Sequence, residues 1–86
     1  MKADHKEVMR LLNIASGQLN GVKKMVEEDA YCIDISNQIL AAIANIKKAN
    51  NAIIVAHLEH CVRNASDDEE IEAKIKEISK LMTRLD

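Results

Sequence analysis

Two cysteines and a histidine are the side chains of this chain best suited to chemistry. His57 and Cys61 are four residues apart in a stretch typical of one long helix, so they share a helix face. At about 1.5 Å of rise per residue, Cys32 and Cys61 lie on the order of 43 Å apart along one straight helix. One unbroken helix therefore cannot gather all three side chains. Two antiparallel copies can, because Cys32 of one then lies beside His57 and Cys61 of the other.

The donor set of this intersubunit site indicates a soft metal. Two thiolates and one imidazole suit Cu(I), which prefers sulfur and accepts three ligands. Zn(II) needs a fourth ligand, from water, His60 or a carboxylate. Without a metal, Cys32 and Cys61 can instead sense reactive sulfur or oxidants by forming an intersubunit disulfide or polysulfide bridge. His57, one turn before Cys61, favours the metal, and an ordinary buried cysteine is the remaining alternative.

The sequence offers little for catalysis. It contains no phosphate-binding loop, no paired catalytic carboxylates and no set of nucleophile, base and orienting group. A cysteine and a histidine on one helix can form a catalytic pair, but an all-helical chain suggests no substrate cleft. We therefore predict that the protein is not an enzyme.

Composition sets the fold class and the compartment. The chain has 86 residues, no Pro, two Gly and a net charge of −2, which predicts one all-α domain over residues 1–86. So small a chain usually oligomerises.

The net charge argues against strong non-specific DNA affinity, but leaves room for a local basic patch. No segment approaches the roughly 20 apolar residues of a membrane span, so we expect a cytoplasmic protein with no membrane partner.

Two long helices are predicted first. The helix over residues 6–28 carries a heptad-like seam, which comprises Val8, Leu12, Ala15, Leu19, Val22 and Val26. Gly17 and Gly21 form a smooth strip on it where another backbone can approach. The helix over residues 30–63 has Asp29 as its predicted N-cap and Cys32 at its third position. Its apolar stripe comprises Ile35, Ile39, Ile43, Ile46, Ile53 and His57. A helix of this length cannot bury itself in one small chain, and we interpret it as a dimerisation rod.

A third, shorter helix follows. Ser66 and Glu69 are predicted to form a capping box at its start. Its seam comprises Ile71, Ile75, Ile78, Met82 and Leu85, and it must dock on a partner to be stable.

Two segments then point to a family. Residues 17–34, GQLNGVKKMVEEDAYCID, and residues 57–62, HLEHCV, resemble the CsoR/RcnR family of small bacterial metal-sensing repressors, with compatible spacing over nearly the whole chain. The resemblance implies a three-helix protomer, an antiparallel four-helix-bundle dimer and a flat dimer-of-dimers tetramer. It also implies a regulatory site across the dimer interface.

The site signature looks like that of the copper-sensing branch. The nickel/cobalt branch has His where Cys61 stands, the formaldehyde-sensing branch lacks this second Cys, and the persulfide-sensing branch lacks the His. The resemblance implies that Tyr31 and Glu77 support the ligand His57 by hydrogen bonding. It further implies that Cu(I) weakens DNA binding and so releases transcription of copper-resistance genes.

The DNA-binding positions depart from the family pattern. Relatives usually carry several Arg around the Gly-Gln pair and one in the second helix, where this chain has Asn13, Ile14, Asn20 and Lys48. Neutral side chains cannot replace the phosphate contacts of Arg. The remaining candidates for operator contacts are Arg10, Lys23, Lys24, Lys47 and Lys48. A metal-binding homologue that has lost DNA binding is therefore an alternative to a repressor.

Overall fold

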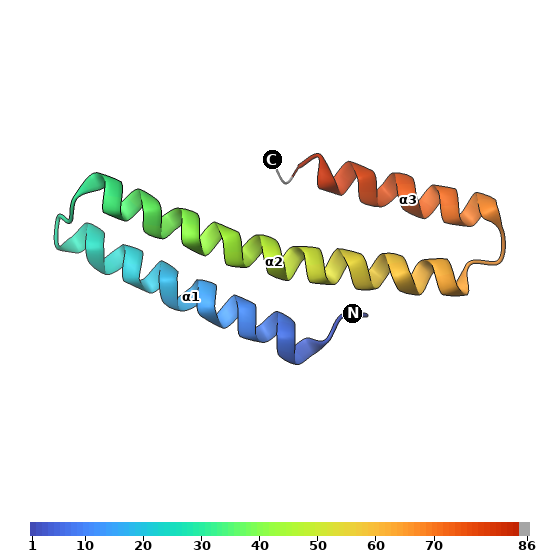
Figure 1. Cartoon of the computed structure of the whole chain (residues 1–86), viewed down its shortest axis with the longest axis horizontal. Helices are drawn as coiled ribbons and strands as arrows, with labels where there is room; N and C mark the ends of the chain where they lie inside the picture. The colour runs from blue at the N-terminus through green and yellow to red at the C-terminus, as the bar shows by residue number, and fades with distance from the viewer. Residues whose placement is uncertain (85–86) are drawn as a thin grey trace.

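The computed structural model describes residues 1–84 and contains three helices. They are α1 (His5–Glu27), α2 (Cys32–Asn64) and α3 (Asp68–Met82). Helix α2 is the spine, and α1 and α3 fold back along its opposite ends (Figure 1). Within the described residues α1 and α3 do not touch each other. The predicted all-α, three-helix protomer is thus confirmed.

The turn between α1 and α2 differs from the prediction. Asp29 does not cap α2. It has φ 54°, and it follows α1 as the left-handed residue of a Schellman motif. The Ala30 N–H donates to the Met25 carbonyl at 2.9 Å, and the Asp29 N–H donates to the Val26 carbonyl at 3.1 Å. Helix α2 therefore begins later than expected, with Tyr31 as an N-cap that makes no side-chain cap bond.

The packing of α1 against α2 uses small residues of α2. Val8 and Leu11 of α1 are buried against Ala49, and the short alanine side chain allows close approach of the two helices. Further along, the Asn45 side-chain amide donates to Gln18 at 2.9 Å. A polar bridge thus joins the two helices midway along the hairpin.

The predicted seam of α1 is only partly correct. Val8, Ala15 and Val22 are buried, but Leu19 and Val26 are 52% and 56% exposed, and Leu11 is buried in place of Leu12. The glycine strip is not a close contact within the chain, because a Cβ on Gly17 would meet nothing within 4 Å. The side of α1 that carries Leu12 and Leu19 is therefore left open.

The cap of α3 is displaced by one residue from the prediction. Asp67, not Ser66, is the N-cap, and its carboxylate accepts from the Glu70 N–H at 2.7 Å. Glu70 in turn accepts from the backbone N–H and the hydroxyl of Ser66. Helix α3 then lies along the C-terminal half of α2 (Figure 1), and its Ile78 is buried. Ile75 and Met82 of the predicted seam are exposed, and Leu85 lies outside the described residues.

The protomer is a plate one helix thick. Its principal extents are 57 × 26 × 12 Å, and only seven hydrophobic residues are buried among residues 1–84. Many large apolar side chains are exposed on α2, including Ile39, Ile43 and Ile46. A single chain therefore leaves most of its apolar surface uncovered.

Helix α2 is, by length and composition alone, able to cross a membrane, contrary to the sequence prediction. Its most apolar window of 18 residues has a mean hydropathy of 1.3. One such helix is weak support for a membrane protein, because a core helix of a soluble protein meets the same condition. Asn45, Lys47, Lys48 and Asn50 also interrupt the apolar surface at mid-helix.

Candidate metal centre

His57 and Cys61, two of the three predicted metal ligands, lie side by side near the C-terminal end of α2. The Cys61 Sγ lies 3.6 Å from the His57 Nε2, because residues four apart on a helix are neighbours on one face. Cys61 is half-buried and His57 is exposed. Both donor atoms thus remain accessible to an incoming metal or to a second chain.

Cys32 lies at the other end of the same helix. It is a free, exposed thiol and is the first residue of α2 rather than the predicted third. Helix α2 is continuous, so Cys32 and His57 are separated by roughly 38 Å along its axis. Within residues 1–84, no three His, Cys, Asp or Glu side chains come close enough to hold a metal.

Tyr31 and Glu77 do not meet the pair within one chain. Tyr31 is 68% exposed beside Cys32. Glu77 lies on α3, where its carboxylate is 3.6 Å from the Lys74 Nζ. Neither side chain hydrogen-bonds His57 within the described residues. A single chain thus brings together only His57 and Cys61 of the five residues predicted for the site.

The predicted DNA-binding residues fall into separate groups. Val8 and Leu11 pack on Ala49, so Arg10 lies near the level of Lys48. Lys23 and Lys24 are about 20 Å further along α1. All five basic side chains are exposed.

Arg10 is occupied by an ion pair. Its Nη2 and Nε donate to the Glu7 carboxylate at 2.6 Å and 3.0 Å. These hydrogen bonds lower the pKa of Glu7 and raise that of Arg10. A phosphate contact by Arg10 would have to compete with this exposed and therefore weak ion pair.

An apolar groove between α1 and α2 was not foreseen as a distinct site. Its volume is about 310 Å³, and its lining comprises Leu12, Ala15, Ser16, Leu19, Ile39, Ala42, Ile43 and Ile46. Leu12 and Leu19 are two of the three residues of the predicted α1 seam that stay exposed, and Val26 is the third. The sequence pattern could have predicted the groove. The heptad spacing places Leu12 and Leu19 on an apolar stripe that is too wide for one neighbouring helix to cover.

A second hollow lies on α3, with a volume of about 440 Å³. Its lining includes Lys76, Lys80 and Arg84, which the sequence prediction did not include among the functional residues. Their spacing of four was the available signal.

The fold defines an all-helical protein in which one long helix, α2, carries Cys32 at one end and His57 with Cys61 at the other. Residues 4–84 match the family described as "Metal-sensitive transcriptional repressor". The chain belongs to this family, which includes the CsoR-type repressors and is not enzymatic.

Named relatives are consistent with this assignment. The copper-sensing transcriptional repressor CsoR of Mycobacterium tuberculosis (strain ATCC 25618 / H37Rv) is 33% identical over 78 residues. That match covers 91% of this chain, which spans 66% of the length of the relative. The copper-sensing transcriptional repressor CsoR of Bacillus subtilis (strain 168) is 32% identical over 81 residues, covering 91% of this chain and 80% of the relative.

A solved structure supports the fold. The nickel-responsive transcriptional regulator InrS matches with a TM-score of 0.78 over 99% of this chain and 96% of that chain. Its sequence is 22% identical, so the likeness concerns the fold alone.

Proposed function

We propose that the protein is a cytoplasmic, copper(I)-responsive transcriptional repressor. Cu(I) binds Cys32 of one chain together with His57 and Cys61 of its partner. Copper binding weakens operator binding and derepresses copper-resistance genes. The observation that carries the proposal is the preorganised His57–Cys61 pair at one end of an unbroken helix that has Cys32 at its other end.

Copper is favoured over nickel by the donor atoms. Two thiolates and one imidazole are soft and borderline ligands, which suit Cu(I) at low coordination number. The relatives from M. tuberculosis and B. subtilis carry copper-sensing names, whereas InrS carries a nickel-responsive one. Nickel or zinc would need further ligands, and His60, one turn from His57, is the nearest nitrogen donor in the sequence.

The open groove supports an antiparallel homodimer. Burying apolar surface stabilises by roughly 25 cal/mol per Å², and Ile39, Ile43 and Ile46 are exposed in the single chain. Two hairpins that face each other across this groove form a four-helix bundle. Antiparallel α2 helices then bring each Cys32 toward the partner's ligand pair, and two dimers assemble into a tetramer.

Tyr31 and Glu77 are proposed to act in this assembly rather than in the single chain. Tyr31 precedes Cys32 and therefore approaches the partner's His57 when Cys32 does. Glu77 supplies a carboxylate that can hydrogen-bond an imidazole N–H and hold the ring in place. Such a bond couples metal binding to the position of α3.

An anaerobic Cu(I) titration against a chelator of known affinity tests the site. We expect tight binding of one Cu(I) per protomer, lost in Cys32→Ala and in Cys61→Ala. His60→Ala is the matched control, because it removes a neighbouring imidazole and leaves the three ligands. Tight stoichiometric binding that persists in Cys61→Ala would falsify the assignment.

Sulfur sensing is the second candidate, supported by the two free thiols, Cys32 exposed and Cys61 half-buried, at opposite ends of α2. His57 can accept the Cys61 proton, and the thiolate can attack the sulfane sulfur of a persulfide donor RSSH, giving Cys61–SSH and RSH. The Cys32 thiolate of the partner then displaces HS⁻ and forms an interchain disulfide. A non-reducing dimer band after persulfide treatment, together with weak copper binding, would place this function first.

Loss of DNA binding is the third candidate. Asn13, Ile14 and Asn20 leave an exposed, neutral surface on α1, where phosphate contacts by Arg are expected in relatives. A protein of this kind would bind Cu(I) tightly but would not bind the promoter of its own gene in any metal state. Gel-shift measurements with that promoter, with and without Cu(I), distinguish it from a repressor.

A further inference from the structure

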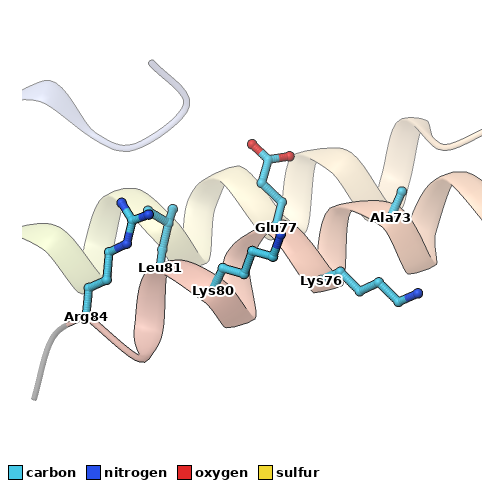
Figure 2. A pocket seen from close by; sticks show the side chains of 6 residues that line it. All are labelled: Ala73, Lys76, Glu77, Lys80, Leu81 and Arg84. Atoms are coloured by element: carbon cyan, nitrogen blue, oxygen red, sulfur yellow. The ribbon is translucent and has the colours of Figure 1, made fainter.

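Three cations lie on one face of the C-terminal half of α3. Lys76, Lys80 and Arg84 are four residues apart in sequence, so they follow one helix face, and all three are exposed. Together with Ala73, Glu77 and Leu81 they line the hollow of about 440 Å³ (Figure 2). We call Lys76, Lys80 and Arg84 the α3 basic stripe.

The stripe extends past Met82, the last residue of α3, into the turn that follows it. Thr83 has helical angles, with φ −67° and ψ −18°. The Arg84 N–H donates to the Leu81 carbonyl at 3.0 Å. This bond spans three residues, as in a 3₁₀ turn, so Arg84 lies in the turn that closes α3, four residues after Lys80.

The described part of the chain, residues 1–84, does not neutralise the stripe. Its acidic neighbour, Glu77, is paired with Lys74 at 3.6 Å, and the Glu77 carboxylate and the Lys76 ammonium point in different directions in Figure 2. Within residues 1–84, none of the three stripe cations forms an ion pair. This distinguishes the stripe from Arg10, which is held by Glu7.

Stabilisation of the helix dipole does not account for the stripe. Cations near a helix C-terminus are favourable, but the effect falls off within the last turn. Lys76 lies six residues before the end of α3. The dipole also favours no particular face, whereas the three cations share one.

We propose that the α3 basic stripe binds phosphates of duplex DNA. The inference rests on the repressor function proposed above and adds a contact surface to it. The stripe spans about 12 Å of helix, which is long enough for its three cations to contact up to about three phosphates of a duplex backbone. These contacts position the protein on the duplex, and they substitute for cations absent at Asn13, Ile14 and Asn20.

A second copy of the chain is the competing occupant of the stripe. The start of α3 is acidic, with Asp67 as its N-cap and Asp68, Glu69, Glu70 and Glu72 in its first turns. Two α3 helices packed antiparallel would match acid to base. The DNA-binding class of the family favours the duplex, and oligomeric state separates the two.

The test compares K76Q/K80Q/R84Q with the unchanged metal-free protein on a random 30-base-pair duplex over a series of salt concentrations. Each lost phosphate contact reduces the slope of log K against log salt by about 0.9. We expect the slope to fall by about 2 to 3 and the affinity at low salt to fall by at least tenfold. The single variant Lys76→Gln should reduce the slope by about 1.

The matched control is K2Q/K6Q/R63Q, which removes the same charge from other surfaces. An equal loss in the control, an unchanged slope in the stripe variant, or no duplex binding by the unchanged protein overturns the proposal. Dissociation of the oligomer in the stripe variant, seen by sedimentation at matched concentration, assigns the stripe to contact between copies and also overturns it.

Failure of the repressor function is measured separately on the same samples. A protein that binds duplex through the stripe but keeps its affinity when Cu(I) is added refutes copper regulation while supporting the stripe. If the stripe variant keeps its DNA affinity and Cu(I) still releases it from DNA, the proposed DNA contact of the stripe is refuted and the repressor function is not.

Discussion

The Cys61 Sγ and the His57 Nε2 are 3.6 Å apart on one face of α2. The pair needs no partner to form, because helix geometry alone sets its spacing. The remaining proposed ligand, Cys32, is on the same rigid helix and cannot reach the pair in its own chain. Rigidity of α2 is therefore what makes the proposed metal site intersubunit.

Mixing two inactive variants should restore copper binding. Cys32→Ala and Cys61→Ala disable different halves of the site, so each mixed dimer has one intact site. Random exchange should recover about a quarter of the unchanged protein's sites, measured by Cu(I) competition. Mixing Cys61→Ala with the double variant Cys61→Ala/His57→Ala is the control. Both disable the same half, and recovery there would refute the intersubunit geometry.

Replacing His57 should affect regulation more than affinity. In His57→Ala two thiolates remain for Cu(I), but the imidazole that links the metal to helix packing is gone. We expect measurable Cu(I) binding with the copper effect on DNA affinity reduced by fivefold or more, within the usual range of coupling of about 1–3 kcal/mol. Unchanged release of DNA by Cu(I) in this variant would show that His57 is not part of the coupling.

A charge in the groove should separate the chains. Ile43 is 41% exposed and lines the groove between α1 and α2. Ile43→Lys places an ammonium in the proposed dimer core, where an unpaired charge is costly. We expect loss of the dimer by sedimentation at micromolar protein. Val55→Lys, an exposed apolar position outside the groove lining, is the control, and equal dissociation by both variants would contradict the assigned interface.

Asp29 should tolerate glycine and resist branched residues. Its φ of 54° costs roughly 1–2 kcal/mol for most side chains, but less for Asp and Asn and almost nothing for Gly. Asp29→Gly should raise the free energy of unfolding by about 0.5 kcal/mol. Asp29→Val should lower it by about 1–2 kcal/mol. Urea unfolding at one fixed protein concentration measures both, with Asp29→Asn as the neutral control.

The cap of α3 should weaken in acid. Hydrogen bonds from the backbone N–H and the hydroxyl of Ser66 lower the pKa of Glu70 below its ordinary value of 4.5. The carboxylate therefore stabilises the fold above that value, and the contribution is lost as the pH falls through the folded-state pKa.

We expect Glu70→Gln to be less stable than the unchanged protein at pH 6 and equal to it at low pH. Thermal unfolding at several pH values measures the difference. Glu69→Gln is the control, because Glu69 makes no such bond to Ser66 in the described residues. A stability gap between Glu70→Gln and the unchanged protein that does not depend on pH would refute a role for the carboxylate charge.

The sequence predicted the three helices and the separation of Cys32 from His57 and Cys61 well, because both follow from helical periodicity. The predictions were wrong at two helix ends, where two neighbouring arrangements of the cap are both favourable. Asp29 can cap a following helix or end a preceding one, and the chain uses the second. Asp67 and Ser66 are both good caps, and the position of Glu70 decides between them.

The prediction of which α1 residues are buried was partly wrong for a different reason. Leu11 and Leu12 are both apolar, and periodicity cannot tell which faces a neighbour in the same chain and which faces a separate one. The structure assigns Leu11 to the hairpin and Leu12 to the groove. The sequence does not predict the α3 basic stripe as a site, because three Lys and Arg at this spacing are typical of an ordinary solvent-exposed helix face. The hollow that they line is visible only in the structure.

The 12 Å thickness of the plate has a consequence for how the proposed sensor would respond to dilution. A chain this thin cannot place all three proposed ligands around one metal ion, so metal binding and dimerisation become coupled equilibria. Copper would then stabilise the dimer, and diluting the protein would lower its apparent affinity for copper. The dose of metal at which such a sensor switches would depend on how many copies of it the cell holds.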